Sequence, residues 1–145
     1  MGSFGTQTAA IYVGGNKGSP PNYASDVEQY DGTSWTTLPN LNTARGNNGS
    51  GAGSATSGLF FGGNKPGPTA ANESEEWNGS SWTATPTLSQ SGVRSGNGAS
   101  SGAALAYGDY PIPPAATEEF NRTVNTVTAG AWAAGGNLNL TRSNV

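Results

Sequence analysis

The sequence contains neither cysteine nor histidine, and only 10% of its 145 residues are charged. The two missing residue types exclude disulfides, thiol nucleophiles, zinc sites built from Cys or His, haem ligation by His, and catalytic triads built on imidazole. Any catalysis would therefore depend on carboxylates and hydroxyls. We expect a protein that is not an enzyme and that uses no cofactor or metal.

Basic charge and long apolar runs are also scarce. Six Lys and Arg stand against nine Asp and Glu, so the formal net charge is −3. The chain lacks the basic surface that attracts nucleic acids or anionic membranes. No apolar run approaches the roughly 20 residues of a membrane span, and the first residues do not follow the pattern of a secretion signal. We expect a soluble chain without nucleic-acid or membrane partners.

Glycine is abundant, with 23 residues, and the chain is a threefold repeat with a period of about 48. Each unit has an apolar run followed by glycine, a glutamate followed by an aromatic residue, a tryptophan, and a segment from Leu to Arg. We divide this single repeat domain into units of about 1–45, 46–94 and 95–145. The landmarks are IYVGGNK at 11–17, VEQYDGTSWT at 27–36 and LNTAR at 41–45; LFFGGNK at 59–65, SEEWNGSSWT at 74–83 and LSQSGVR at 88–94; and LAYGD at 105–109, TEEFN at 117–121, Trp132 and LNLTR at 138–142.

Each unit predicts four short strands and no helix. The apolar run has β-propensity and stops at glycines that can take positive φ. The next strand of the first unit ends at Asp31-Gly32, which favours a two-residue type I′ turn, and Trp35 opens its partner strand. A fourth strand follows Arg45 and is rich in Gly, Asn and Ser, as in residues 46–53. Its small side chains predict a closely crowded backbone.

The glycine pair, the aromatic residue after Glu and the Trp some five residues later resemble a blade of the kelch family. The resemblance covers essentially the whole chain and implies an all-β fold of three four-stranded β-propeller blades. The segments TEEFN, SEEWNGSSWT, LNTAR and FGTQTAA are also similar to degenerate kelch-like repeats in tail and other virion proteins of environmental bacteriophages. That similarity implies a structural or adhesive role in a virion or at an extracellular surface.

Three blades do not make a ring, because propellers close with roughly 4–8 blades. Two chains would supply six, so we expect a homodimer in which each chain is half of a six-bladed propeller. The alternative is that the chain is a fragment of a longer polypeptide whose other blades close the ring. By alignment of the repeats, the chain is cut within the Gly-rich strand, so that its ends join across subunits. The predicted subunit interface contains Phe4, Thr6, Thr141, Arg142 and Val145.

Acidic and basic residues repeat in phase, which allows two interpretations. The glutamates pair with the arginines between or within blades, or the carboxylates form a catalytic set or a metal ring. Repetition favours the structural role, because an active site needs one asymmetric arrangement whereas a fold needs the same support in every blade. The residues concerned are Glu28, Glu75 and Glu118, with Arg45, Arg94 and Arg142.

Aromatic residues in phase are expected to form the blade core, since each buries about 150–250 Å² and aliphatic residues are few. Stacking platforms for sugars are the alternative. The in-phase positions are Tyr30, Trp77 and Phe120, with Trp35, Trp82 and Trp132.

Proline-rich loops at 16–23, 64–71 and 110–116 are expected on one face of the propeller. They are the most variable segments of the repeat, and they make the best candidate for a binding face. The candidate binding residues are Lys17, Tyr23, Lys65 and Tyr110. The alternative function is therefore a lectin-like propeller, with a glycan or other virion proteins as possible partners, while simple solvated connections remain the competing interpretation.

Overall fold

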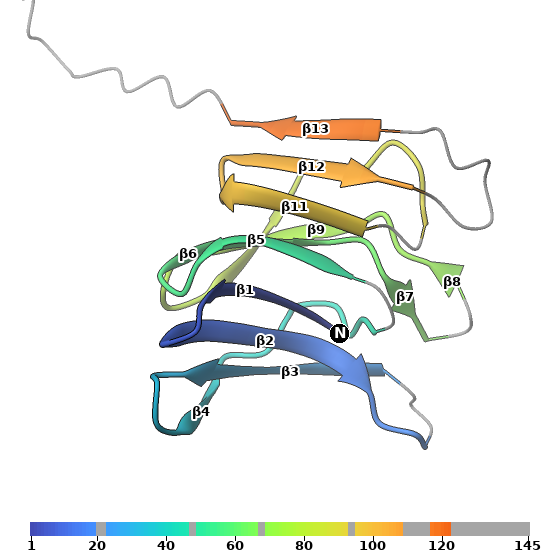
Figure 1. Cartoon of the computed structure of the whole chain (residues 1–145). Coiled ribbons are helices and arrows are strands. Elements are labelled where there is room, and N and C mark those ends of the chain that lie inside the picture. The colour runs from blue at the N-terminus through green and yellow to red at the C-terminus, as the bar shows by residue number, and fades with distance from the viewer. Residues whose placement is uncertain (20–22, 47–48, 67–68, 93–94, 109–116, 123–145) are drawn as a thin grey trace, which may run out of the picture.

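The computed structural model describes residues 1–19, 23–46, 49–66, 69–92, 95–108 and 117–122. These residues form antiparallel sheets, which confirms the all-β prediction (Figure 1). No helix long and apolar enough to cross a membrane is found among them.

Two four-stranded sheets, one three-stranded sheet and one small hairpin make up the described structure. The first sheet contains β1 (Gly2–Thr6), β2 (Ala9–Asn16), β3 (Tyr23–Tyr30) and β4 (Trp35–Leu38) in that order. The second contains β5 (Ser50–Ser54), β6 (Ser57–Phe61), β9 (Ser74–Trp77) and β10 (Trp82–Thr85). The third contains β11 (Ser95–Ser100), β12 (Ala103–Tyr107) and β13 (Thr117–Asn121), and β7 (Asn64–Lys65) pairs with β8 (Thr69–Ala70).

The three sheets repeat one strand register. Opposite the in-phase glutamate lies Tyr12 in the first sheet, Phe60 in the second and Ala106 in the third. Residues two apart along a strand share a face, so positions that match in the sequence also match in the face they occupy. Each residue can therefore be compared with its equivalents in the other sheets.

The sheets follow one another with β1, β5 and β11 side by side (Figure 1). A Cβ at Gly51 in β5 would lie 2.7 Å from Phe4 Cδ1 and 2.9 Å from the Ser3 carbonyl oxygen, so only glycine fits there. This close approach confirms the crowding predicted for the Gly-rich segments. These segments pair with the apolar strand that follows them, so each is the first strand of a sheet rather than the last.

The β3–β4 and β9–β10 hairpins differ from the predicted two-residue turns. Four residues separate Tyr30 from its partner Trp35, and the backbone N–H of Asp31 donates to the Ser34 carbonyl. The carboxylate of Asp31 accepts hydrogen bonds from the N–H groups of Thr33 and Ser34, both at 2.8 Å. In a type I′ turn, a backbone carbonyl accepts the hydrogen bond that closes the turn. Here the Asp31 carboxylate takes the place of that carbonyl. Asn78 does the same in the second sheet.

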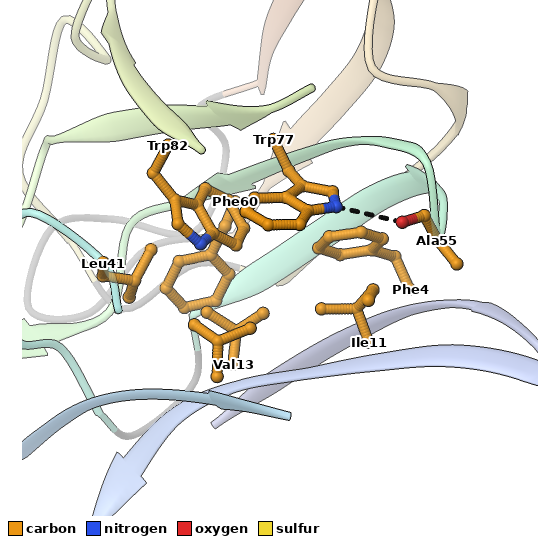
Figure 2. Packing of buried hydrophobic residues seen from close by; sticks show 9 residues of the cluster. Phe4, Ile11, Val13, Leu41, Ala55, Phe60, Trp77 and Trp82 are labelled. Atoms are coloured by element: carbon orange, nitrogen blue, oxygen red, sulfur yellow. Dashed lines mark hydrogen bonds between the residues drawn. The ribbon is translucent and has the colours of Figure 1, made fainter. Parts of the chain in front are cut away.

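The main core lies between the first and second sheets (Figure 2). Ile11 and Val13 of β2 are fully buried against aromatic residues of the second sheet. The Trp77 indole N–H donates to the Ala55 carbonyl at 2.9 Å, which satisfies the only polar atom of that buried ring. A smaller core of Ala52, Leu59, Phe61, Ala104 and Ala106 joins the second and third sheets.

Candidate functional site

A buried ion pair joins the first and second sheets. Arg45 follows the first sheet, and its Nη2 lies 2.9 Å from Oε1 of Glu75 in β9, with both side chains almost fully buried. Its Nη1 donates to the Glu73 carbonyl, and its guanidinium carbon lies 4.8 Å from the centre of the Phe60 ring. The pairing of in-phase Glu and Arg between sheets is confirmed at this position.

The Glu75 carboxylate also accepts hydrogen bonds from the segment that connects the first sheet to the second. Its Oε2 accepts from the N–H and side-chain amide of Asn42, at 2.9 and 2.8 Å, and its Oε1 accepts from the Thr43 N–H. At the next junction, Oε2 of Glu118 accepts from the N–H of Ser89, the equivalent of Asn42, at 2.7 Å. Glu75 and Glu118 therefore anchor the segment that arrives from the preceding sheet.

Two glycines make room for this segment in the first sheet. Gly14 and Gly15 have φ of 62° and 133°, and the Gly15 N–H donates to the Arg45 carbonyl at 3.0 Å. The Arg45 N–H in turn donates to the carbonyl of Ala24. The glycine pair thus positions the Arg45 backbone so that its side chain reaches the second sheet.

Burial and charge act in opposite directions on the ionisable groups here. Burial lowers the pKa of Arg45, while the charges of Glu75 and Glu73 raise it in part. Burial alone would raise the pKa of Glu73, but the hydrogen bond from Lys65, a backbone hydrogen bond and the nearby cations bring it below the ordinary value. These surroundings favour the charged form of the Glu73 carboxylate.

The outward face of the first sheet carries three aromatic residues, Tyr12, Tyr30 and Trp35. The Tyr30 and Trp35 rings lie 5.1 Å apart at 36°, and their equivalents Trp77 and Trp82 lie 5.4 Å apart at 41°. Trp35 is nevertheless 54% exposed, whereas Trp77 and Trp82 are 1% and 7% exposed. The second-sheet pair is covered by the first sheet, and the first-sheet pair has no sheet beyond it in the part of the chain that the structure describes. We name Tyr12, Glu28, Tyr30 and Trp35 the first-sheet flank.

The outward face of the third sheet carries exposed residues at positions that meet a following sheet elsewhere in the molecule. Leu105 and Tyr107 are 38% and 43% exposed, while their equivalents Ile11, Val13, Leu59 and Phe61 are at most 2% exposed. Those equivalents pack against the following sheet. We name Leu105 and Tyr107 the third-sheet flank.

The prediction that in-phase aromatic residues form the core is thus confirmed for Trp77 and Trp82 and wrong for Trp35, which lies in an outermost sheet. Tyr30 and Phe120 are half-buried. Trp132 lies outside the described residues.

The candidate binding residues have partners of their own. Lys17 Nζ lies 2.7 Å from Oδ2 of Asp26, and Lys65 pairs with Glu73. Tyr23 is half-buried beside Gly46, which forms an isolated bridge with Asn64 of β7. The ends of β2 and β7 thus share one edge of the molecule (Figure 1). Tyr110 lies outside the described residues.

Of the five predicted interface residues, Phe4 and Thr6 lie in the described part of the chain. Phe4 is 7% exposed, with its ring 6.3 Å from that of Trp82, so its side chain is a contact within the chain. We therefore leave Phe4 out of the interface proposed below. Thr6 is exposed at the end of β1. Thr141, Arg142 and Val145, like Arg94, lie outside the described residues.

A pocket of about 240 Å³ lies between the second and third sheets. Pro86 and Leu88 line it on one side, and Ala106 and Phe120 on the other. At the previous junction, the place of Ala106 is taken by the ring of Phe60. The Trp82 indole there donates to the carbonyl of Pro39, the equivalent of Pro86. The pocket therefore corresponds to space that aromatic rings fill at the first junction.

Among the described residues, no three carboxylates gather as a metal site would require. A scan of the chain against protein-family models finds no match, and a search of curated proteins finds none either. The resemblance to kelch repeats accordingly stays a prediction.

Proposed function

We propose that the chain is half of a six-bladed β-propeller that closes by pairing with a second copy, and that it works as a non-enzymatic structural or adhesive module. Each sheet would be one blade, and three blades from each of two chains would complete the ring.

One observation carries this proposal: Trp35, Leu105 and Tyr107 are exposed on the two outermost sheets of the described structure, whereas their described equivalents are buried between sheets. Trp35 is 54% exposed against 7% for its equivalent Trp82. Exposed large apolar side chains gathered on one face mark interaction surfaces. The two flanks are also of opposite kind, since one matches the face that meets a preceding sheet and the other the face that meets a following sheet.

The use of the carboxylates supports a non-enzymatic role. Glu75 and Glu118 accept hydrogen bonds from backbone amides of the connecting segments. A general base or nucleophile needs its carboxylate oriented toward a substrate, whereas these oxygens hold the chain together.

The similarity of the repeats to those of phage tail and virion proteins supports a place in a virion or at an extracellular surface. A lectin-like function at the loop edge is the alternative, and we place it second because Lys17 and Lys65 both form ion pairs. A glycan array separates the two functions. Binding that is lost in Tyr23→Ala or Tyr110→Ala would favour the lectin, and silence across the array would favour the scaffold.

Light scattering coupled to size-exclusion chromatography tests the proposed assembly. A closed pair has a mass near twice 14.6 kDa. Trp35→Ala should shift this species toward the single-chain mass, because it removes the most exposed apolar ring of the first-sheet flank. A wild-type chain that stays at 14.6 kDa over the accessible concentration range would overturn the proposal.

A further inference from the structure

A cavity of about 330 Å³ opens beside the first-sheet flank, at the end of β2. Nine residues line it, and each has an equivalent in the second repeat. The three that matter chemically are Tyr12, Asp26 and Glu28. Lys17 also lines the cavity, where it pairs with Asp26 as Lys65 pairs with Glu73.

The second-sheet equivalents of these three residues hold the side chain of Arg45. Phe60, in the place of Tyr12, presents its ring to the guanidinium. Glu73, in the place of Asp26, supplies a carbonyl oxygen, and Glu75, in the place of Glu28, supplies the carboxylate. The cavity is therefore the first-sheet counterpart of an arginine site that is filled in the second sheet.

Glu28 differs from its equivalents because its carboxylate has no hydrogen-bond or ion-pair partner among the described residues, and it is exposed. Glu75 and Glu118 each receive a backbone N–H from the segment that follows the preceding sheet. No sheet precedes the first one in the described part of the chain, so no corresponding backbone N–H reaches the Glu28 carboxylate there. By analogy with the second repeat, the Tyr12 ring, the Asp26 carbonyl oxygen and the Glu28 carboxylate suit a guanidinium, which stacks on aromatic faces and pairs with carboxylates.

We propose that this cavity, defined by Tyr12, Asp26 and Glu28, is a guanidinium socket that receives Arg142 from a second copy of the chain. Arg142 is the sequence equivalent of Arg45, in LNLTR as Arg45 is in LNTAR. The inference rests on the proposed pairing of two chains and specifies its geometry. The third-sheet flank of each chain covers the first-sheet flank of the other, and the ring has two identical junctions.

Charge reversal with mixing tests this geometry. E28R brings two arginines together at both junctions of its own dimer, and R142E brings two glutamates together there. Removing one partner of a buried ion pair costs about 3–5 kcal/mol, so each variant alone should dimerise at least ~100-fold more weakly than the wild type. In the mixture, one junction pairs the native Arg142 with the native Glu28. The other junction pairs the two introduced side chains, whose charges are again opposite. Equimolar mixing should therefore restore a two-chain species containing one chain of each variant.

Thr36→Arg is the matched control, because it adds positive charge to β4 on the opposite face of the first sheet. It should dimerise as the wild type does. Far-ultraviolet circular dichroism establishes that E28R and R142E are folded, and Glu28→Gln serves if E28R is not, with a dimer weakened in the same direction. Folded variants that dimerise normally alone, or a mixture that stays at the single-chain mass, would overturn the socket while the wild-type dimer stands. A monomeric wild type would overturn the pairing itself.

Discussion

The first and second sheets share a register and a set of aromatic and acidic positions, yet their corresponding faces have different surroundings. In the second sheet, Trp77, Trp82 and Glu75 are buried against the first sheet and its connecting segment. In the first sheet, Tyr30, Trp35 and Glu28 occupy the same positions and face outward. Residue type and local strand geometry are therefore not what buries a position of this repeat. Burial depends on the presence of a neighbouring sheet.

The largest expected difference lies at the aromatic pair. Trp77→Ala should lower the free energy of unfolding by about 3–5 kcal/mol, because it leaves a cavity in the main core and orphans the Ala55 carbonyl. Tyr30→Ala at the equivalent position should lower the free energy of unfolding much less in dilute solution. The difference from the wild type should grow with protein concentration, because the proposed second copy would cover Tyr30. Urea unfolding at several concentrations measures both. Equal losses at every concentration would contradict the comparison.

The acidic positions give the second test. Glu75→Gln leaves the charge of Arg45 buried without its partner and should cost about 3–5 kcal/mol, measured by urea unfolding. Glu28→Gln should leave the unfolding of the dilute chain almost unchanged and should instead weaken association.

A double-mutant cycle measures how strongly Arg45 and Glu75 are coupled. Arg45→Met combined with Glu75→Leu removes both charges, and should recover much of the stability lost in either single variant. Strict additivity of the two single losses would mean that the ion pair does not couple the sheets.

The neighbouring strands β1 and β5 give a third, smaller contrast. Gly51→Ser should cost about 1–3 kcal/mol, because a Cβ there would come too close to Phe4 and to the Ser3 carbonyl. Ser3 occupies the equivalent position of β1, where it is exposed, and Ser3→Ala should be close to neutral. Thermal unfolding by circular dichroism measures both. A Gly51→Ser variant as stable as the wild type would refute close packing of β1 on β5.

The smallest effect concerns the two hairpins and depends on pH. Hydrogen bonds from the N–H groups of Ser34 and Thr33 hold the pKa of Asp31 below its ordinary value. Its stabilising contribution is therefore complete above the ordinary carboxyl pKa and is lost as pH falls through the lowered pKa of the folded state. Asp31→Asn should remove this part of the pH dependence, since Asn78 supports the equivalent hairpin without titrating. An NMR titration in which Asp31 keeps its ordinary pKa would contradict this pH-dependent contribution of the Asp31 hydrogen bonds.

Much of the fold could be predicted from the sequence because the signals are local and occur three times. The strands, the crowded glycine segments and a structural pairing of glutamates with arginines follow from in-phase positions, although the sequence left open whether each pair lies within or between units. The hairpin turns could not, because the side chains of Asp31 and Asn78 replace a backbone acceptor. The dipeptides Asp-Gly and Asn-Gly do not show whether a side chain or a backbone carbonyl will accept the hydrogen bonds of the turn.

The candidate site was harder to predict for a different reason. Exposure of Trp35 and Leu105 depends on which sheet lies beyond them, and equivalent residues in a repeat look alike whether or not a neighbour is present. The sequence likewise did not distinguish Glu28, beside the proposed socket, from the equivalent glutamates Glu75 and Glu118. The in-phase recurrence of glutamates and arginines was the available signal, but it did not show that each glutamate pairs with the arginine of the preceding unit.

The most direct test of the central claim, that two copies close one ring, is native mass spectrometry of the wild-type chain. Heterologous contacts produce a closed ring if the rotation returns to its start and an open series of oligomers if it does not. Our account predicts one discrete species of two chains, at twice 14.6 kDa, with no larger members. A spectrum containing only single chains, or a ladder of three, four and more chains, would contradict it.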